Sequence, residues 1–252
     1  MKIKINKKNK IKCIRFLDIK FNNFCDEDLL KILENFGLFI FPAAPALTDM
    51  KINSNYHKSL ISADYVFFDS GYLVILLRFL KGIKVKKFSG YKFLQLLFEY
   101  LKMNKSKNLF LIDPSINVSK KNFELLDLYG LKNTTNYIAP IYEGEKIEDQ
   151  KLLEKLNKIK PDFIIVNIGG GKQEILGNYI KKKINFNTKI ICTGAAISFF
   201  TKEQAPINFF YDKLYIGWLI RIIFNPKIFL PRYLKSIKLF LIVFKNKISI
   251  EN

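Results

Sequence analysis

The stretch DFIIVNIGGGKQEILGNYI, residues 162–180, decides the predicted fold. It begins as a short apolar run, breaks at Gly169, Gly170 and Gly171, and resumes in a polar, helix-like pattern. A strand, a glycine turn and a helix in this order are typical of parallel sheets covered by helices. Plain tight turns also use glycine, and the spacing matches neither GxGxxG nor a P-loop. We predict a ligand site, because such a turn presents backbone N–H groups at a helix start, where anions bind.

The residues directly after the three glycines are polar. Lys172 offers a positive charge, and Gln173 and Glu174 offer hydrogen-bonding groups. These side chains suit a ligand that carries both phosphate and sugar hydroxyls. We therefore expect Gln173 and Glu174 to bind or orient such a ligand beside the glycine turn.

The alternation of strand and helix patterns continues along the chain. Apolar runs predict strands at residues 37–42, 65–69, 108–113, 162–168 and 189–194. Helical patterns occupy residues 47–61, 71–82, 91–102, 118–130, 149–160 and the segment after the glycine turn. We predict an α/β fold over residues 1–205, a Rossmann-like parallel sheet with helices on both faces. Residues 206–252 predict a basic, aromatic, helical appendage without strands, broken at Asn225-Pro226.

The charge balance is strongly basic. The chain of 252 residues carries 42 Lys and Arg against 22 Asp and Glu, a formal charge of +20. Such an excess favours anionic partners, namely nucleic acid, anionic lipid or phosphorylated substrates. A general preference for Lys, Ile, Asn and Phe in this sequence explains the excess equally well.

Cysteine and histidine are scarce. Cys13, Cys25 and Cys192 are odd in number and lack CxxC spacing, which predicts neither a disulfide framework nor a zinc site and fits a reducing cytosol. The lone His57 lies in a polar, helix-like stretch and is predicted to be on the surface. A catalytic metal would therefore need mainly carboxylate ligands.

Two basic segments bear on membrane association. The N-terminal MKIKINKKNKIKCIRF has no continuous apolar core or cleavage site, so it does not predict a secretory signal. Residues 214–244 are apolar, but charged residues and prolines interrupt them at Arg221, Pro226, Lys227, Pro231 and Arg232. This segment is expected to lie on a membrane rather than cross it.

Two further strand ends carry candidate site residues. Asp69 follows an apolar strand, where a carboxylate can act as a general base or hold a hydroxyl. Asp69 or Ser70 could instead cap the next helix, and the sequence alone favours capping. Thr193 and Gly194 end another strand before two alanines, a pattern that suits close packing or the approach of a ligand.

Arginines stand among aromatic residues in the appendage. Arg221 and Arg232 suit bidentate pairing with a pyrophosphate. The surrounding aromatic side chains suit the headgroup boundary of a bilayer. An ordinary amphipathic helix pair that closes the core would show the same pattern. The aromatic residues are Trp218, Phe224, Phe229 and Tyr233.

Three separate blocks, in order, resemble the WecG/TagA/CpsF glycosyltransferase family. They are PDFIIVNIGGGKQE, IICTGAAISFFTKEQAP and LYIGWLIRIIFNPKIFLPRYL, within a match over about residues 26–240. The resemblance implies transfer of a hexose or N-acetylhexosamine from a UDP-sugar to a polyprenyl-pyrophosphate-linked acceptor. It further implies inversion at the anomeric carbon, no metal or other cofactor, and a role in cell-surface polysaccharide synthesis. The implied location is cytoplasmic, peripheral on the inner face of the cytoplasmic membrane.

The resemblance also assigns residues. The family's proposed base lies in an ADxxxxDG block, here SADYVFFDSG, which makes Asp69 the base and inserts Ser70 before the glycine. Arg221 and Arg232 match arginines that complete the site. The chain departs from a Thr-Pro-Asn-like stretch, where it has FPAAPALT, beginning at Phe41 and including Thr48. The departure at Phe41-Pro42-Ala43 indicates a divergent branch.

These expectations combine into one mechanism. The glycine turn, with Gln173, Glu174, Thr193 and Gly194, would hold the donor, and Asp69 would take the acceptor's proton. The arginines would stabilise the leaving UDP. The expected partners are the UDP-sugar, the lipid-linked acceptor and the anionic inner leaflet, with no nucleic acid. Association with a second copy of the chain is left open. The competing hypothesis is a non-catalytic basic α/β protein that binds nucleic acid or a partner complex.

Overall fold

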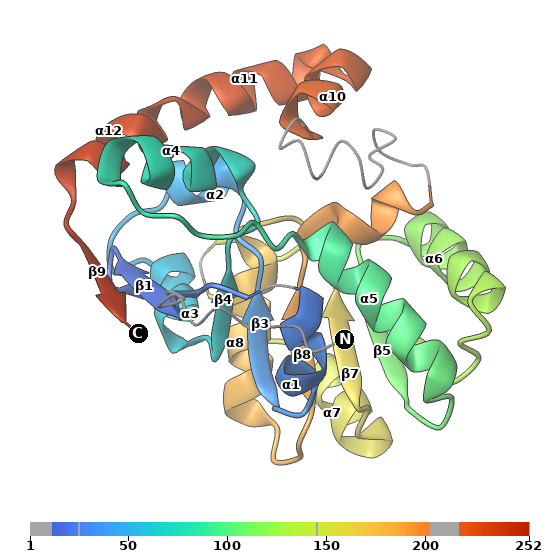
Figure 1. Ribbon diagram of the computed structural model, residues 1–252. Coiled ribbons are helices and arrows are strands. Elements are labelled where there is room, and N and C mark those ends of the chain that lie inside the picture. The colour runs from blue at the N-terminus through green and yellow to red at the C-terminus, as the bar shows by residue number, and fades with distance from the viewer. Residues whose placement is uncertain (1–11, 25, 145, 202–216, 252) are drawn as a thin grey trace, which may run out of the picture.

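The computed structural model describes residues 12–24, 26–144, 146–201 and 217–251 (Figure 1). Nine strands form a single sheet in the order β6-β5-β7-β8-β3-β4-β2-β1-β9. The first seven in this order run parallel, and β1 is antiparallel to both β2 and β9. The strands are β1 (Cys13–Phe16), β2 (Ile19–Asn22), β3 (Gly37–Ile40), β4 (Tyr65–Phe67), β5 (Leu109–Asp113), β6 (Thr134–Ile138), β7 (Phe163–Val166), β8 (Lys189–Cys192) and β9 (Ile248–Glu251).

Helices cover both faces of the sheet. One face packs against α2, α3, α4, α7, α8 and α12, and the other against α1, α5, α6 and the short helix η2. The helices are η1 (Asp26–Asp28), α1 (Leu29–Leu33), α2 (Ala44–Thr48), α3 (Asn55–Ser62), α4 (Gly71–Lys81), α5 (Gly90–Met103), α6 (Ile116–Leu128), α7 (Gln150–Ile159), α8 (Lys172–Lys183), η2 (Gly194–Phe199), α10 (Gly217–Phe224), α11 (Pro226–Ser236) and α12 (Lys238–Lys245).

The central strands are apolar on both sides because each side packs against helices. In β3, Leu38 and Ile40 point into one core and Phe39 into the other. Successive side chains of a strand point to opposite faces, so a strand buried on both faces reads as a continuous apolar run. The predicted Rossmann-like α/β fold is confirmed, including the helices on both faces.

Local signals placed most helices correctly. Ser70 and Ser89 cap α4 and α5 by accepting hydrogen bonds from backbone N–H groups. Gly82 ends α4 in the left-handed conformation, with φ of 66°. The helix predicted at residues 47–61 is wrong as a single helix. It is two, α2 and α3, separated by a turn in which Asn53 has a φ of 64° and Ser54 caps α3.

The strands that were not predicted pair with distant segments of the chain. Strands β1, β2 and β6 were not predicted, and the expectation of no strand after residue 206 was wrong, because β9 pairs with β1. His57 is buried rather than exposed. Its Nε2 lies 2.8 Å from the carbonyl oxygen of Leu17, and its Nδ1 accepts a hydrogen bond from the Asn53 N–H. This histidine ties α3 to the turn between β1 and β2.

The C-terminal helices cross the edge of the sheet at which the parallel strands end (Figure 1). Asn225 caps α11 and Pro226 is its first residue, which confirms the predicted break. α11 packs on α2, and α12 packs on both α2 and α4. The predicted boundary between residues 205 and 206 lies outside the described residues. Among the helices described, none is long and apolar enough to cross a bilayer.

Candidate active site

One cavity of about 760 Å³ lies at the carboxyl ends of four neighbouring strands. Turns after β3, β4, β7 and β8 form one side of it, and α10 and α11 form the other. Ligands of open parallel sheets bind at this edge, and the volume is typical of small-molecule sites. All ten residues predicted for the site line this cavity: Asp69, Gly169, Gly170, Gly171, Gln173, Glu174, Thr193, Gly194, Arg221 and Arg232.

Asp69 is held by α5 rather than by the helix that follows it. Its Oδ1 accepts a hydrogen bond of 2.9 Å from the Gly90 N–H, at the start of α5. The cap of α4 is Ser70, whose Oγ accepts from the Leu73 N–H. Ser70, rather than Asp69, is therefore the cap of α4. The carboxylate of Asp69 lies in the wall of the cavity and is held there by the N-terminus of α5.

The glycine turn leaves the cavity open. A Cβ atom added to Gly169 or Gly170 would meet no other atom within 4 Å. Both glycines therefore face open space and are not packed against other residues. Gly171 has a φ of 91°, a conformation that favours glycine. Lys172, expected to add charge here, does not line the cavity, because its ammonium group donates to the carbonyl oxygen of Gly144.

Gln173 and Glu174 join two turns of the cavity. Glu174 Oε2 accepts from the Gly171 N–H at 2.7 Å, and Glu174 Oε1 accepts from Gln173 Nε2 at 3.0 Å. Gln173 Oε1 in turn accepts from the Gly194 N–H at 2.6 Å. Both side chains are almost fully buried. They therefore hold the glycine turn against the end of β8.

Burial also changes the acidity of Glu174. Desolvation raises the pKa of its carboxyl group from 4.5 to about 7, against the opposing effect of the hydrogen bonds from Gln173 and from backbone N–H groups. The carboxylate form costs more in this surrounding than in water because the cavity wall is poorly solvated. The charge of the network therefore changes near neutral pH.

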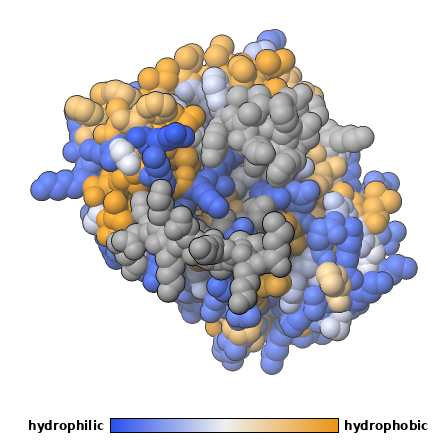
Figure 2. Space-filling model, in the orientation of Figure 1, coloured by the Kyte–Doolittle hydropathy of each residue, from blue (hydrophilic) through white to orange (hydrophobic). Residues whose placement is uncertain are grey.

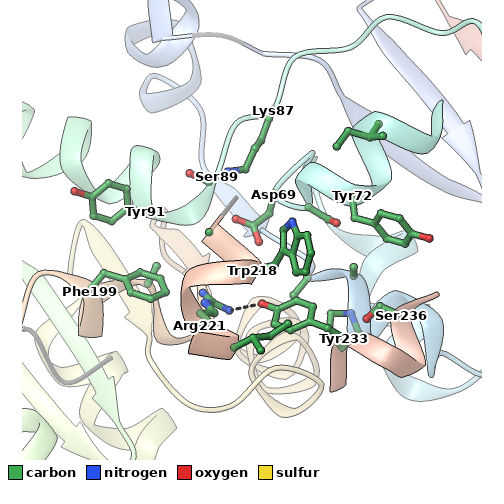
Figure 3. A pocket seen from close by; sticks show the side chains of 18 of the residues that line it. Asp69, Tyr72, Lys87, Ser89, Tyr91, Phe199, Trp218, Arg221, Tyr233 and Ser236 are labelled. Atoms are coloured by element: carbon green, nitrogen blue, oxygen red, sulfur yellow. Dashed lines mark hydrogen bonds between the residues drawn. The ribbon is translucent and has the colours of Figure 1, made fainter. Parts of the chain in front are cut away.

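The two arginines enter from the C-terminal helices. The guanidinium group of Arg221 lies 4.6 Å from the ring of Phe199 and 5.9 Å from that of Phe229. Its Nη1 is 3.5 Å from the hydroxyl of Tyr233 (Figure 3). Aromatic faces attract a guanidinium and hold it in place. Arg232, on α11, is exposed and reaches the same cavity.

The model of the glycosyl transferase WecG/TagA/CpsF family matches residues 14–252. The chain belongs to this family. A curated relative, the UDP-Gal:alpha-D-GlcNAc-diphosphoundecaprenol beta-1,4-galactosyltransferase of Shigella boydii, is 26% identical over 178 residues. That alignment covers 66% of this chain and 70% of the relative. The predicted family, glycosyltransferase activity and role in polysaccharide synthesis are confirmed.

The stretch predicted to depart from the family pattern begins with a residue that packs in the core. Phe41 is buried, and its ring lies 4.5 Å from that of Phe67 and 5.1 Å from that of Phe93. Ala43 follows it in the wall of the cavity. Thr48 lines neither cavity described here, and its hydroxyl donates to the Ala44 carbonyl.

Sequence reasoning missed a second cavity of the glycosyltransferase, of about 400 Å³. It adjoins the first and shares Asp69, Thr193, Arg221 and Tyr233 with it. Figure 3 shows Trp218 and Tyr233 with Asp69 and Arg221 in its wall. The available signal was the run of apolar residues on α4 and α11, but nothing local to either helix shows that the two face each other.

The metal prediction stays a prediction. Within the part of the chain that the structure describes, no group of three or more His, Cys, Asp or Glu side chains could hold a metal ion. Cys13 and Cys192 are free thiols, and Cys25 lies outside the described residues.

Proposed function

We propose that this glycosyltransferase moves a hexose or N-acetylhexosamine from a UDP-sugar to a saccharide carried on a polyprenyl diphosphate, with inversion. The observation that carries the proposal is the convergence of Asp69, the glycine turn and two arginines on one cavity. The relative from Shigella boydii supports it, since its name states a UDP-Gal donor and a GlcNAc-diphosphoundecaprenol acceptor.

In the proposed reaction, Asp69 accepts the proton of the acceptor hydroxyl as its oxygen attacks the anomeric carbon. The bond from that carbon to the UDP oxygen breaks, and UDP leaves with the electron pair. Attack from the face opposite the leaving group inverts the configuration. Arg232, Arg221 and the N–H groups of the glycine turn stabilise the negative charge that develops on the diphosphate.

The direct test is analysis of the product. The full-length protein is incubated with a GlcNAc-diphosphate lipid and with each of a panel of UDP-hexoses. The mass of the acceptor is then measured by mass spectrometry. The expected result is an increase by one sugar residue with at least one donor. No increase with any donor, together with thermal stabilisation by oligonucleotides that salt abolishes, would favour the nucleic-acid alternative instead.

The C-terminal helices supply a candidate membrane surface. Apolar side chains gather along the top of the face in Figure 2, over α11, α12 and α4. On the C-terminal helices, Ile223 of α10, Leu234 of α11 and Phe244 of α12 are each more than half exposed. Lys227 and Lys238 are exposed on the same helices. We propose that this surface rests on the anionic inner leaflet. Each lysine near such a leaflet contributes about 1 kcal/mol to the free energy of binding.

Vesicle sedimentation tests the membrane proposal separately. Replacing Lys227 and Lys238 with glutamine should weaken binding to anionic vesicles roughly 30-fold, since about 1.4 kcal/mol is a factor of ten. The same variants should show no change toward neutral vesicles. Unchanged binding to anionic vesicles would rule out these helices as the electrostatic contact.

A further inference from the structure

The smaller cavity extends from Asp69 and Arg221 away from the glycine turn, between α4 and the helices α10 and α11. None of the three glycines of the turn lines it. Its wall beyond the shared residues is mainly apolar and aromatic. The side chains that matter most here are Tyr72, Ile75, Trp218, Ile222, Leu230 and Leu234.

We propose that this cavity holds the first isoprene units of the acceptor's polyprenyl chain. This inference rests on the proposed function, whose acceptor carries a sugar, a diphosphate and a lipid in that order. The hydroxyl of the acceptor sugar must reach Asp69, which lies where the two cavities meet. The donor occupies the larger cavity beside the glycine turn, so the rest of the acceptor extends into the smaller one.

Charge along the cavity follows the same order. Lys87 lines only the smaller cavity, where the acceptor diphosphate would lie, and Arg221 lies where the two cavities meet. Arg232 lines only the larger cavity and is left for the leaving UDP. A diphosphate placed next to Lys87 directs its lipid toward the apolar wall formed by Ile75 and Leu234.

Three side chains of this wall, on α10 and α11, are partly exposed, so the cavity opens to the surface beside them. Trp218 is 43% exposed, Leu230 43% and Leu234 56%. These side chains belong to the same helices as the candidate membrane surface. A polyprenyl chain that enters from the bilayer would therefore meet these apolar side chains at the opening of the cavity. The apolar groove is thus continuous with the site of transfer at one end and with the proposed membrane contact at the other.

Trp218 is the single tryptophan of the chain and lines this cavity, so its fluorescence reports binding directly. The full-length protein is titrated, without vesicles or detergent, with inorganic diphosphate, geranyl diphosphate and farnesyl diphosphate. Each buried methylene group favours binding by about 0.8 kcal/mol, which is about fourfold in affinity. We expect farnesyl diphosphate to bind at least tenfold more tightly than geranyl diphosphate and to shift the emission of Trp218, and inorganic diphosphate to leave it unchanged.

Two leucines of similar exposure provide the matched variants. Leu234 lines the cavity and Leu241, 52% exposed on α12, does not. Leu234→Asn should lower the affinity for farnesyl diphosphate at least fivefold. Leu241→Asn should bind farnesyl diphosphate with the affinity of the natural protein. Affinity that is independent of chain length, or equal losses in the two variants, would overturn the inference.

The same titration separates the two proposals. Transfer to a GlcNAc-diphosphate lipid with no dependence on chain length and no change in Trp218 emission would refute the lipid cavity but leave the proposed function standing. Binding of farnesyl diphosphate that follows the expected order, without transfer from any UDP-hexose, would refute the proposed function and leave a prenyl diphosphate site.

Discussion

The two sides of the larger cavity are held in different ways. On the sheet side, hydrogen bonds of 2.6–3.0 Å link Gly171, Glu174, Gln173 and Gly194 into one chain. On the helix side, α10 has no buried residue, and Arg221 is placed by aromatic rings. The sheet side is fixed by directional bonds between neighbouring turns, whereas the helix side depends on how α10–α12 pack. In the proposed mechanism Asp69 and the N–H groups of the glycine turn act from the sheet side, and the two arginines act from the helix side.

Removing the proposed base is expected to have the largest effect. Asp69→Asn should lower kcat by about 100- to 10,000-fold, because the amide cannot accept the proton of the acceptor hydroxyl. The asparagine oxygen can still accept from the Gly90 N–H, so the fold and the affinity for UDP should stay nearly the same. Steady-state kinetics and calorimetric titration with UDP measure the two effects. Near-natural turnover in the variant would remove Asp69 from the mechanism.

A second change tests how the helix side is attached. Leu239, on α12, is fully buried in the same core as the sheet residues. Leu239→Ala should lower the free energy of unfolding by about 2–5 kcal/mol, since it leaves a cavity in that core. Urea denaturation followed by circular dichroism should still show one transition, because β9 also joins these helices to the sheet through β1.

The exposed Leu241 supplies the control for that experiment. Leu241→Ala should change the stability by less than about 0.5 kcal/mol. A separate, weaker transition in Leu239→Ala would mean that α10–α12 unfold on their own. In that case the helix side would be an independent unit, as the predicted division at residue 206 implies.

The sheet side also carries a pH dependence. The pKa of Glu174 is about 7 in the folded protein and 4.5 in its ordinary state. Below about pH 4.5 the carboxyl is protonated whether the chain is folded or not. Between 4.5 and 7 the folded protein keeps a proton that the unfolded chain has released, so stability falls as the pH rises, and the loss is complete above 7.

Glu174→Gln should remove this decline, which amounts to roughly 3 kcal/mol. Urea unfolding across pH 4 to 8, compared between the natural protein and the variant, isolates the contribution of this one group. The exposed Glu154→Gln is the matched control and should keep the natural pH profile. A profile of Glu174→Gln that also coincided with the natural one would show that Glu174 titrates in its ordinary range.

The contrast between the two sides also explains what the sequence could predict. The turns after β4, β7 and β8 have local signals, namely an apolar run followed by Asp69, by glycines or by Thr193. Their meeting follows from the parallel sheet, because the carboxyl ends of its strands lie at one edge. Sequence patterns of this kind therefore predicted both the fold and the residues of the larger cavity.

Contacts between distant segments left no such signal. β9 pairs with β1 across 238 residues of chain, and His57 bonds to Leu17 across 40. The hydrogen bond from the Gly194 N–H to Gln173, which joins two different turns, was not predicted either. The smaller cavity likewise needs α4 and α11 to face each other. Each of these features depends on which elements become neighbours, which the local pattern does not determine.

The smallest expected effect comes from adding one methyl group to the glycine turn. Gly170→Ala places a Cβ atom in open space at an ordinary backbone conformation, so stability should change by less than about 1 kcal/mol. Gly171→Ala should instead cost about 1–2 kcal/mol, because its φ of 91° is strained for alanine. If the donor diphosphate lies against the turn, the methyl group of Gly170→Ala raises the KM for the UDP-sugar severalfold without a change in melting temperature. An unaltered KM would show that the donor does not bind in the open space over Gly170, on the sheet side of the cavity.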